Sequence, residues 1–170
     1  MMLHDPKRHQ RRKRSASGPP SFAVAAESLF DIIDELPPLF VRYGNEHAVA
    51  PTDPDWQTML HMAANGSLRI VTARYDGALV GFCVNLLTRP LMYKSTLYGT
   101  TIAVWLEKPY RSGWNGVRLL RGNKKLLEQW GCQRLYIASD RNRLGQLFEY
   151  LGYAFIEAHY MSEANAGISL

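Results

Sequence analysis

The chain has 170 residues, of which 46% are hydrophobic and 21% are charged, and its formal net charge is +5. This length and apolar content suit one domain with its own core, and they exclude a disordered chain, a collagen and a disulfide-stapled miniprotein. The longest apolar run covers the ten residues 78–87 and is interrupted by Asn85, whereas a bilayer span needs about 20 residues. The sequence therefore predicts no contact with a membrane.

The excess positive charge lies in the first fourteen residues, which hold six basic side chains and one acid. Residues 1–20 are polar, basic and rich in Ser, Gly and Pro, so we predict a disordered basic N-terminal arm followed by one domain over 21–170. The arm is either a solubilising extension or a contact for a nucleic acid or an acidic partner.

The two cysteines, Cys83 and Cys132, stand far apart in apolar surroundings, without a CxxC pair or a nearby histidine at ligand spacing. We interpret both as core residues and expect no metal. An arginine-rich start also occurs in transit peptides, but Gly18, Pro19 and Pro20 would end an amphipathic helix early. We therefore expect a cytoplasmic protein.

The first elements along the chain are predicted to be helices. Apolar residues at helical spacing predict a helix over 25–36 that ends at Pro37-Pro38. A second helix is expected to begin at Thr52 as its N-cap and to end at Asn65-Gly66.

Strands follow. Residues 68–75 and 78–87 are rich in β-formers and flank Asp76-Gly77, which is typical of a two-residue hairpin turn. Residues 93–106 predict a third long strand beside this hairpin.

The last third of the chain alternates between helices and strands. The pattern predicts an amphipathic helix over 116–130, a short strand at 135–138, a helix over 144–151 and a final strand at 154–161. The whole order indicates one α/β domain.

The segment 106–117, LEKPYRSGWNGV, joins the long strand to the amphipathic helix. A glycine-containing turn that leads into the first turn of a helix presents unpaired backbone N–H groups at the positive end of the helix dipole. Gly113, Gly116 and the nearby Arg111 therefore indicate either a site for a phosphate or pyrophosphate or a glycine-containing turn that only caps the helix.

Three segments resemble one family. Residues 110–120, YRSGWNGVRLL, resemble the coenzyme A pyrophosphate loop of the GNAT acetyltransferase superfamily, whose pattern is Arg/Gln-x-x-Gly-x-Gly/Ala. Residues 147–153, LFEYLGY, resemble the family's late Leu-Tyr-Glu-Lys-Leu-Gly-Phe segment. Residues 131–137, GCQRLYI, resemble the glycine and following strand that precede this segment in the family. With residues 92–98, the chain is most similar to small GNAT proteins encoded by bacteriophages, which would place it in the host cytoplasm.

The resemblance implies an α/β GNAT fold, with a mixed, mostly antiparallel central sheet flanked by helices and a splayed parallel pair of central strands at the coenzyme site. It implies transfer of an acetyl group from acetyl-CoA to an amine by direct attack, without a metal. The positions that would bind the coenzyme are Trp105, Leu106, Arg111, Ser112, Gly113, Trp114, Asn115, Gly116 and, more remotely, Asn142.

The resemblance also suggests catalytic groups. Glu107 ends the long strand and is the candidate base, while the backbone of Trp105 and Leu106 is the candidate oxyanion donor. Phe148 stands where relatives often carry the tyrosine that protonates the leaving thiolate, so Tyr150 and Tyr153 become the candidate acids.

Two departures from the family pattern favour a different reading. Trp114 replaces the first loop glycine and Phe148 replaces the usual tyrosine. The alternative is a non-catalytic GNAT-fold module that binds a host factor or a nucleic acid through the arm. The acceptor stays unidentified, and whether the protein forms a homodimer stays open.

Overall fold

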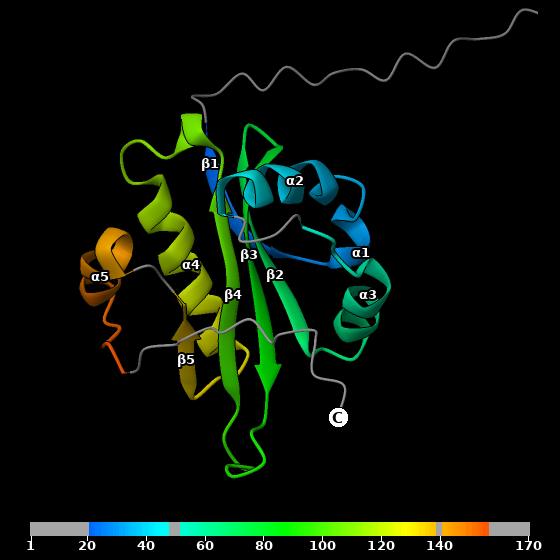
Figure 1. The fold of residues 1–170 in the computed structure, drawn as a ribbon, viewed down its shortest axis with the longest axis vertical. Coiled ribbons are helices and arrows are strands. Elements are labelled where there is room, and N and C mark those ends of the chain that lie inside the picture. The colour runs from blue at the N-terminus through cyan, green and yellow to red at the C-terminus, as the bar shows by residue number, and fades with distance from the viewer. Residues whose placement is uncertain (1–20, 48–51, 139–140, 157–170) are drawn as a thin grey trace, which may run out of the picture.

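The computed structural model describes residues 21–47, 52–138 and 141–156. A five-stranded sheet in the order β1-β2-β3-β4-β5 runs through this part of the chain, antiparallel except for the parallel pair β4–β5 (Figure 1). The strands are β1 (Phe22–Glu27), β2 (Leu68–Tyr75), β3 (Ala78–Thr88), β4 (Tyr98–Leu106) and β5 (Arg134–Ile137).

Helices cover both faces of the sheet (Figure 1). One apolar cluster joins the first three helices to the sheet around Phe82, and another joins the fourth helix to the opposite face around Val71 and Cys83. The helices are α1 (Leu29–Ile32), α2 (Leu36–His47), α3 (Trp56–Ala64), α4 (Asn115–Gln129) and α5 (Arg141–Tyr150), with one 3-10 turn, η1, at Lys108–Tyr110.

The predicted helix over 25–36 is wrong. Its first residues belong to β1, where Ala25 to Glu27 pair with Thr72 to Ile70 of β2, and Ser28 then caps the single turn of α1. Pro37 and Pro38 lie in the first turn of α2 instead of ending a helix. Proline is tolerated there, because backbone N–H groups in the first turn have no acceptor within the helix and none is lost.

The hairpin is confirmed, since β2 and β3 pair in antiparallel register around Asp76 and Gly77, whose φ angles of 50° and 84° require the left-handed region. Two boundaries differ from the prediction. Asp55 caps α3 in place of Thr52, accepting a hydrogen bond from the Thr58 N–H at 3.0 Å. The long strand begins at Tyr98, because the preceding residues form turns between β3 and β4.

The alternation predicted for the last third of the chain is confirmed through α5, with helix α4 and strand β5 within about one residue of their predicted limits. The proposed final strand is not present at Ala154–Ile156, and its remaining residues lie outside the described part, as does the arm over 1–20. Among the described helices, none combines the length and apolarity needed to cross a bilayer.

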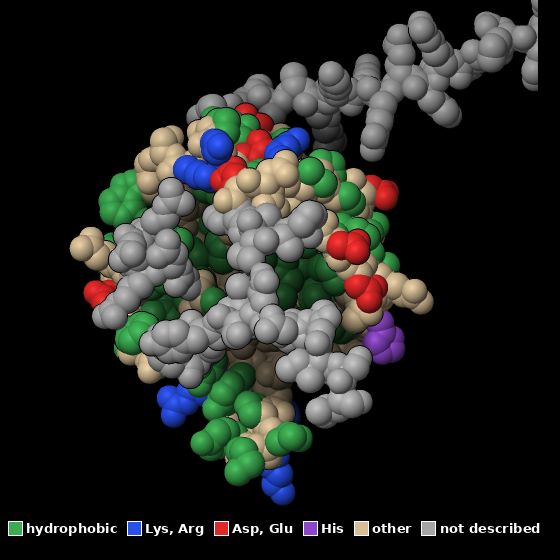
Figure 2. All heavy atoms as spheres, viewed as in Figure 1, with side chains coloured by type: hydrophobic (Ala, Val, Ile, Leu, Met, Phe, Trp, Pro, Cys, Tyr) green, Lys and Arg blue, Asp and Glu red, His purple; other side chains and the backbone are tan. Residues whose placement is uncertain are grey.

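An apolar tip projects from the connection between β3 and β4, where hydrophobic side chains gather beside a basic one (Figure 2). Leu91 is fully exposed and Met92 nearly so. The rings of Tyr93, Tyr98 and Tyr136 stack in series from this tip to β5. The tip lies at the end of the sheet away from η1 and the start of α4 (Figure 1).

Candidate active site

The parallel strands β4 and β5 separate part-way along β4. They pair from Tyr98 with Arg134 to Thr101 with Ile137, where β5 ends, whereas β4 continues to Leu106. A bulge lies at the point of separation, because Thr101 opposes Asn85 of β3 and Ala103 opposes Val84, which leaves Ile102 without an opposite residue. A bulge bends and twists its strand. The second half of β4 therefore presents an edge that β5 does not cover.

A closed triangle of buried side chains holds α4 against this point of the sheet. Asn85 Nδ2 donates to Asn123 Oδ1 at 2.8 Å, Asn123 Nδ2 donates to Thr101 Oγ1 at 3.0 Å, and Thr101 Oγ1 donates to Asn85 Oδ1 at 2.7 Å. All three residues are at most 2% exposed. Each side chain both donates and accepts, so the triangle satisfies polar groups that would otherwise be costly to bury.

The N-terminus of α4 lies beside the uncovered edge and has no side-chain cap. Trp114 is the N-cap, and its carbonyl accepts the first helical hydrogen bond from Arg118 N–H at 2.8 Å. Gly113 has φ of +67°, which a side chain rarely tolerates, and a Cβ at Gly113 or Gly116 would meet no atom within 4 Å. The loop thus presents uncapped backbone N–H groups to open space, which is the arrangement that binds phosphate.

Arg111 points away from this loop. Its Nε donates to the Leu106 carbonyl at 2.6 Å, its Nη2 donates to Glu46 of α2 at 2.6 Å, and its guanidinium lies 5.8 Å from the centre of the Trp105 ring. A phosphate contact from Arg111 would require the side chain to leave these partners. Its role in binding stays a prediction, and the structure adds an observed role in joining α2 to β4.

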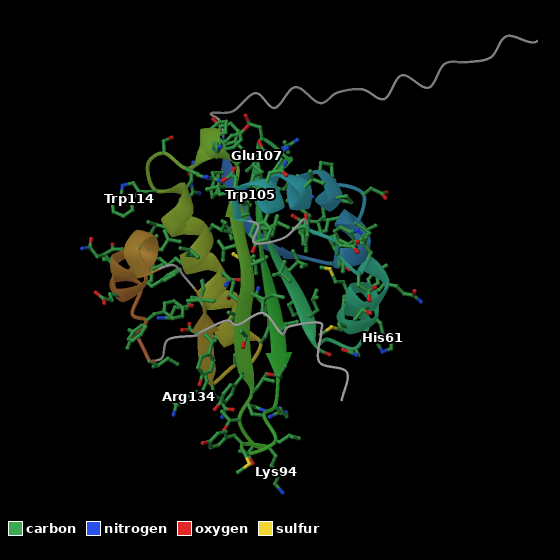
Figure 3. The ribbon with its side chains drawn as sticks, in the orientation of Figure 1. His61, Lys94, Trp105, Glu107, Trp114 and Arg134 are labelled. Atoms are coloured by element: carbon green, nitrogen blue, oxygen red, sulfur yellow. The ribbon has the colours of Figure 1, made fainter. Side chains whose placement is uncertain are left out.

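Glu107, the candidate base, lies at the end of β4 and forms an ion pair with Arg42 of α2 (Figure 3). Arg42 and Glu46 are four residues apart on α2, as Glu107 and Arg111 are on the other segment, so two ion pairs of opposite polarity join the same two elements. The pair with Arg42 would have to loosen before the carboxylate reached a proton on a substrate.

Trp105 and Leu106, the two candidate oxyanion donors, differ in the direction of their backbone N–H groups. The Glu107 N–H donates to the Val80 carbonyl of β3 at 2.8 Å, so the neighbouring peptide N–H of Leu106 points to the opposite, uncovered edge. Trp105 lies opposite Phe82 in the β3–β4 ladder. Of the two, Leu106 is the residue whose backbone N–H faces the gap between β4 and β5.

Comparisons with known proteins address the fold as a whole. No protein-family model and no curated protein sequence matches the chain. Among solved structures, the chain is similar to a ribosomal-protein-alanine N-acetyltransferase from Brucella melitensis biovar Abortus 2308, with 20% identity and a TM-score of 0.67. It is also similar to the aminoglycoside acetyltransferase HMB0005 from an uncultured soil metagenomic sample, with 14% identity and a TM-score of 0.68, and to glucosamine-6-phosphate N-acetyltransferase from Arabidopsis thaliana, with 12% identity and a TM-score of 0.64. Each similarity covers 85% of this chain and 99% of the other.

The chain has the GNAT acetyltransferase fold. The fold class predicted from the sequence is thereby confirmed, including the mixed sheet flanked by helices and, among the described strands, the parallel pair β4–β5. The closer similarity to phage-encoded GNAT proteins stays a prediction.

The two candidate acids of this GNAT-fold domain lie on the side of α4 that faces α5. Tyr150 is 60% exposed, and its hydroxyl accepts a hydrogen bond from Arg121 Nη2 at 3.0 Å. Tyr153 packs edge-on against Phe148 and belongs to the apolar cluster that includes Val104 and Ile137, at the gap between β4 and β5. Burial raises the pKa of Tyr153 to about 12. Its phenol therefore keeps its proton throughout the neutral range.

The remaining predicted positions are less informative. Ser112 is exposed in the bend before Gly113, and the Asn115 side chain donates to the Tyr110 carbonyl at 3.2 Å. Asn142 lies in the first turn of α5, but its side chain falls outside the described part. Trp114 is 66% exposed and points outward (Figure 3).

The described residues were also compared with what a metal ion or a reactive thiol needs. No group of three or more His, Cys, Asp or Glu side chains there is placed to hold a metal ion. Cys83 and Cys132 are buried free cysteines, and burial raises the pKa of both thiols.

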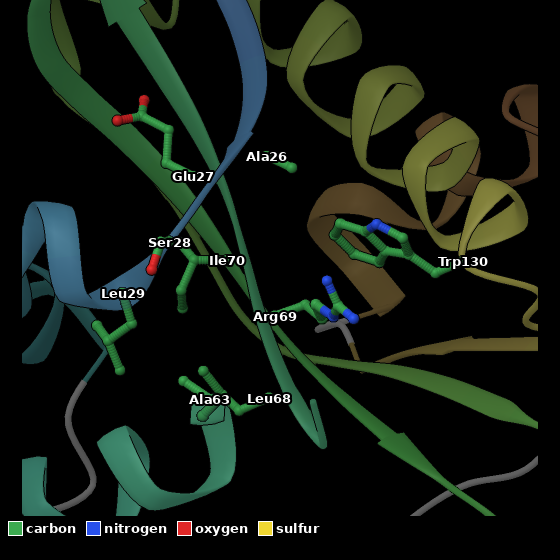
Figure 4. A pocket seen from close by; sticks show the side chains of 9 residues that line it. All are labelled: Ala26, Glu27, Ser28, Leu29, Ala63, Leu68, Arg69, Ile70 and Trp130. Atoms are coloured by element: carbon green, nitrogen blue, oxygen red, sulfur yellow. The ribbon is translucent and has the colours of Figure 1, made fainter. Parts of the chain in front are cut away.

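A pocket lies at the opposite end of α4, beside Trp130 and Arg69 (Figure 4). The Arg69 guanidinium lies 5.3 Å from the centre of the Trp130 ring, Glu27 is bonded to Arg74, and Ser28 caps α1. Its polar side chains are thus engaged with other parts of the protein, and it is separated from the Gly113 loop by the length of α4.

Sequence reasoning missed Glu46, Arg42 and the side-chain triangle. Asn85 did interrupt an apolar run, and Asn123 stands between Leu119 and Leu127 on the inner stripe of α4. Both were signals of a buried polar contact, although neither indicated its partner. The two ion pairs left no signal at all, because their members are 65 residues apart in the chain.

Proposed function

We propose that this protein transfers an acetyl group from acetyl-CoA to an amine acceptor. The observation that carries the proposal is the uncapped N-terminus of α4 beside the uncovered end of β4. Acetyl-CoA supplies an activated acetyl thioester and a diphosphate. Backbone N–H groups at a helix N-terminus suit the diphosphate, and a free strand edge suits the amide groups of the coenzyme's arm.

The residues of this chain that would hold the coenzyme are those around the loop and the strand end. Open space at Gly113 and Gly116 leaves room for close backbone approach, and Leu106 presents its N–H at the edge. The full set is Trp105, Leu106, Ser112, Gly113, Trp114, Asn115 and Gly116, with Arg111 and Asn142 as further candidates.

The similar structures support acetyl transfer as the class of reaction. The three proteins described above are named for acetylating a ribosomal-protein alanine, an aminoglycoside and glucosamine 6-phosphate, respectively. These acceptors differ widely while the fold is shared. We therefore extend only the acetyl transfer to this chain.

Direct transfer forms an amide bond as the thioester C–S bond breaks, so the protein must accept a proton from the amine and supply one to the sulfur. We assign the oxyanion donor to Leu106 N–H and the proton acceptor to Glu107, directly or through water. We assign the proton donor to Tyr153 rather than Tyr150, because Tyr153 packs at the gap and Tyr150 lies on the outer surface against Arg121.

The experiment that tests coenzyme binding is calorimetric titration of acetyl-CoA and coenzyme A into the wild type and two Gly116 variants. Gly116→Asp places a carboxylate where the diphosphate would bind, and its Cβ meets no neighbour. We expect affinity to fall about thirtyfold, which corresponds to about 2 kcal/mol of charge repulsion. The same carboxylate stabilises the first turn of a helix, so the melting temperature should not fall.

Gly116→Ala is the matched control, since it adds a Cβ without charge and favours helix. It should retain coenzyme binding. If the wild type binds neither acetyl-CoA nor coenzyme A while folded, the proposal is wrong and the non-catalytic GNAT-fold module becomes the better account.

Replacing each candidate acid with phenylalanine should separate them. We expect Tyr153→Phe to slow turnover about a hundredfold and Tyr150→Phe to change it by less than about twofold. Because the pKa of Tyr153 is raised to about 12, the difference should stay constant from pH 7 to pH 9. Release of free thiol from acetyl-CoA, with the best amine of a screened panel, measures both rates. Equal effects of the two changes would remove Tyr153 as the donor.

The remaining parts of the proposal rest on sequence alone. We propose that the reaction takes place in the cytoplasm and that the basic residues before position 20 contact a nucleic acid or an acidic partner. Measuring retention of the full chain and of a chain lacking 1–20 on polyanionic resin over a salt gradient would test the second point.

A further inference from the structure

The apolar tip between β3 and β4 exposes large hydrophobic side chains to solvent. Leu91 is 100% exposed, Met92 is 85% exposed and Tyr93 is 59% exposed. Two turns shape the tip, since the Tyr93 N–H donates to the Pro90 carbonyl and the Thr96 N–H donates to the Tyr93 carbonyl, both at 2.9 Å. Leu91 and Met92 are the central residues of the first turn and therefore project outward. Adjacent exposed hydrophobic side chains on such a projection mark an interaction surface.

Positive charge surrounds the apolar tip. Arg89 precedes the hydrophobic residues, Lys94 follows them, and Arg134 begins β5 beside the base of the tip (Figure 3). All three side chains are exposed, and within the described residues none of them forms an ion pair. The sequence has no acidic residue between Asp76 and Glu107. The charge of this region is therefore complementary to an anionic partner.

The aromatic rings of the tip are poorly placed to bind a nucleic acid. Single-stranded nucleic acids bind by stacking their bases on free aromatic faces. Here the rings stack on one another, with centroids 6.3 Å apart for Tyr93 and Tyr98 and 5.1 Å apart for Tyr98 and Tyr136. These contacts use the ring faces within the protein, and the aliphatic Leu91 and Met92 offer no face for a base.

A protein partner also fits the tip poorly. A stable protein interface uses about 20–30 residues on each side, whereas the tip presents the three large hydrophobic side chains of residues 91–93. A symmetric contact between the tips of two copies of this chain would bring Arg89 and Lys94 close to the same residues of the second copy. Like charges at such a distance oppose the pairing.

We propose that the apolar tip docks on a membrane surface that carries anionic lipids, with Leu91 and Met92 inserted among the acyl chains. A fluid bilayer accepts a small convex projection without a preformed pocket. Aromatic rings are favoured at the level of the headgroups, where Tyr93 would lie, and the anionic surface attracts the basic side chains of Arg89 and Lys94. Contact of this kind needs no spanning helix. It departs from the sequence-based prediction of no contact with a membrane.

The location of the tip separates this inference from the proposed acetyl transfer. The tip lies at the end of the sheet away from η1 and the start of α4 (Figure 1). A membrane bound at the tip would therefore leave the Gly113 loop accessible to the coenzyme. The inference goes beyond the proposed function, and a failure of acetyl transfer would not affect it.

The test places an environment-sensitive fluorophore on the tip of the full chain. The two cysteines, Cys83 and Cys132, are buried and burial raises the pKa of their thiols, so Leu91→Cys supplies an exposed thiol that is labelled selectively. Vesicles of phosphatidylcholine with about 30% phosphatidylglycerol are then added. We expect emission from position 91 to shift to shorter wavelength and to be quenched by nitroxide groups on the acyl chains. Val41→Cys, at an exposed position of α2, is the matched control and should show neither change.

A second readout measures the affinity of the unlabelled chain for the same vesicles by co-sedimentation. Leu91→Ser combined with Met92→Ser retains every charge and should lower the affinity about tenfold. Arg89→Gln combined with Lys94→Gln retains the hydrophobic residues and should also lower it about tenfold, and this difference should shrink as salt is added. Val41→Ser removes an exposed hydrophobic side chain elsewhere and should leave the affinity unchanged. Because all these positions are exposed, the melting temperatures should stay close to that of the wild type.

Other results overturn the inference. Vesicle binding without any change at position 91 would assign the contact to the basic residues before position 20. A folded chain that does not bind the vesicles would exclude a membrane partner. A change at position 91 caused by a single-stranded oligonucleotide but not by vesicles would assign the tip to a nucleic acid. A change that grows with protein concentration in the absence of vesicles would assign the tip to contact between copies of the chain.

Discussion

Replacing Asn123 with leucine is expected to lower the free energy of unfolding by about 3 kcal/mol. Leucine is similar in size but removes both a donor and an acceptor from the closed triangle. Asn85 Nδ2 would keep only its 3.4 Å contact with the Arg69 carbonyl, and the Thr101 hydroxyl would lose the donor on α4. Both groups are buried, so water cannot replace the lost partner.

The effect should extend to the candidate active site. Thr101 is the last residue of β4 that pairs with β5, and Asn123 fixes α4 to the sheet at that level. We therefore expect Asn123→Leu to weaken coenzyme binding as well, although the residue lies two turns from the Gly113 loop. Urea unfolding followed by circular dichroism measures stability, and calorimetry measures binding.

Asn45→Leu on the exposed side of α2 is the matched control and should change the free energy of unfolding by less than about 0.5 kcal/mol. Replacing Asn85, Thr101 and Asn123 together by Leu, Val and Leu should cost less than the sum of the single changes, because no polar group is then left unpaired. A loss below about 1 kcal/mol for Asn123→Leu alone would show that the triangle contributes little to stability.

Arg74→Met is the second change with a large expected effect, about 2 kcal/mol of unfolding free energy at pH 7. Arg74 donates to both carboxylate oxygens of Glu27, to both of Glu35 and to the Gly77 carbonyl, at 2.8 to 3.0 Å. It therefore ties the end of β1 and the start of α2 to the β2–β3 turn. Methionine retains an unbranched apolar side chain comparable to the aliphatic part of arginine, without the five hydrogen bonds.

The same change should flatten the dependence of stability on acid. Hydrogen bonds from Arg74 hold the pKa values of Glu27 and Glu35 below their ordinary value of 4.5. The unfolded chain thus binds protons first as pH falls, so the stabilisation is complete above about pH 5 and is lost as pH drops through the folded pKa values. In Arg74→Met this loss between pH 5 and pH 3 should shrink.

Urea unfolding at pH 7, 5, 4 and 3 measures the effect of Arg74→Met. Arg89→Met, at an exposed position of the β3–β4 connection, removes a positive charge without touching either carboxylate and should follow the wild-type profile. Parallel profiles for wild type and Arg74→Met would mean that Arg74 does not set the pKa values of these two groups.

The sequence determined by itself those features that depend on neighbouring residues. Asp76-Gly77 allows the left-handed angles of a tight turn, so the hairpin could be predicted from the dipeptide and its flanks. The apolar stripe of α4 and the glycine-containing loop before it are likewise local patterns. They were sufficient to predict the helix and, with the late LFEYLGY segment, the resemblance to the GNAT fold, while the anion site at the start of the helix stays a prediction.

The tertiary structure decided whatever depends on residues distant in the chain. Ala25 to Glu27 lie within a segment of helical apolar spacing, yet they pair with β2 through inter-strand hydrogen bonds. A short helix without a buried face would be less stable than this pairing, so these residues form the edge strand of the sheet. Arg111 is a residue type that often binds phosphate, yet in the fold its guanidinium donates to Glu46 of α2.

The choice between Tyr150 and Tyr153 also required the tertiary structure. The two are three positions apart, and only the packing of α5 on α4 places one against the apolar cluster at the gap and the other on the surface. The partners of buried polar groups also required the tertiary structure. The sequence shows that Asn85 and Asn123 interrupt apolar patterns, but their hydrogen-bond partners depend on the assembled sheet and helix. Local conformational preferences are encoded in adjacent residues, whereas the partners of charged and polar side chains are set by the fold that brings distant segments together.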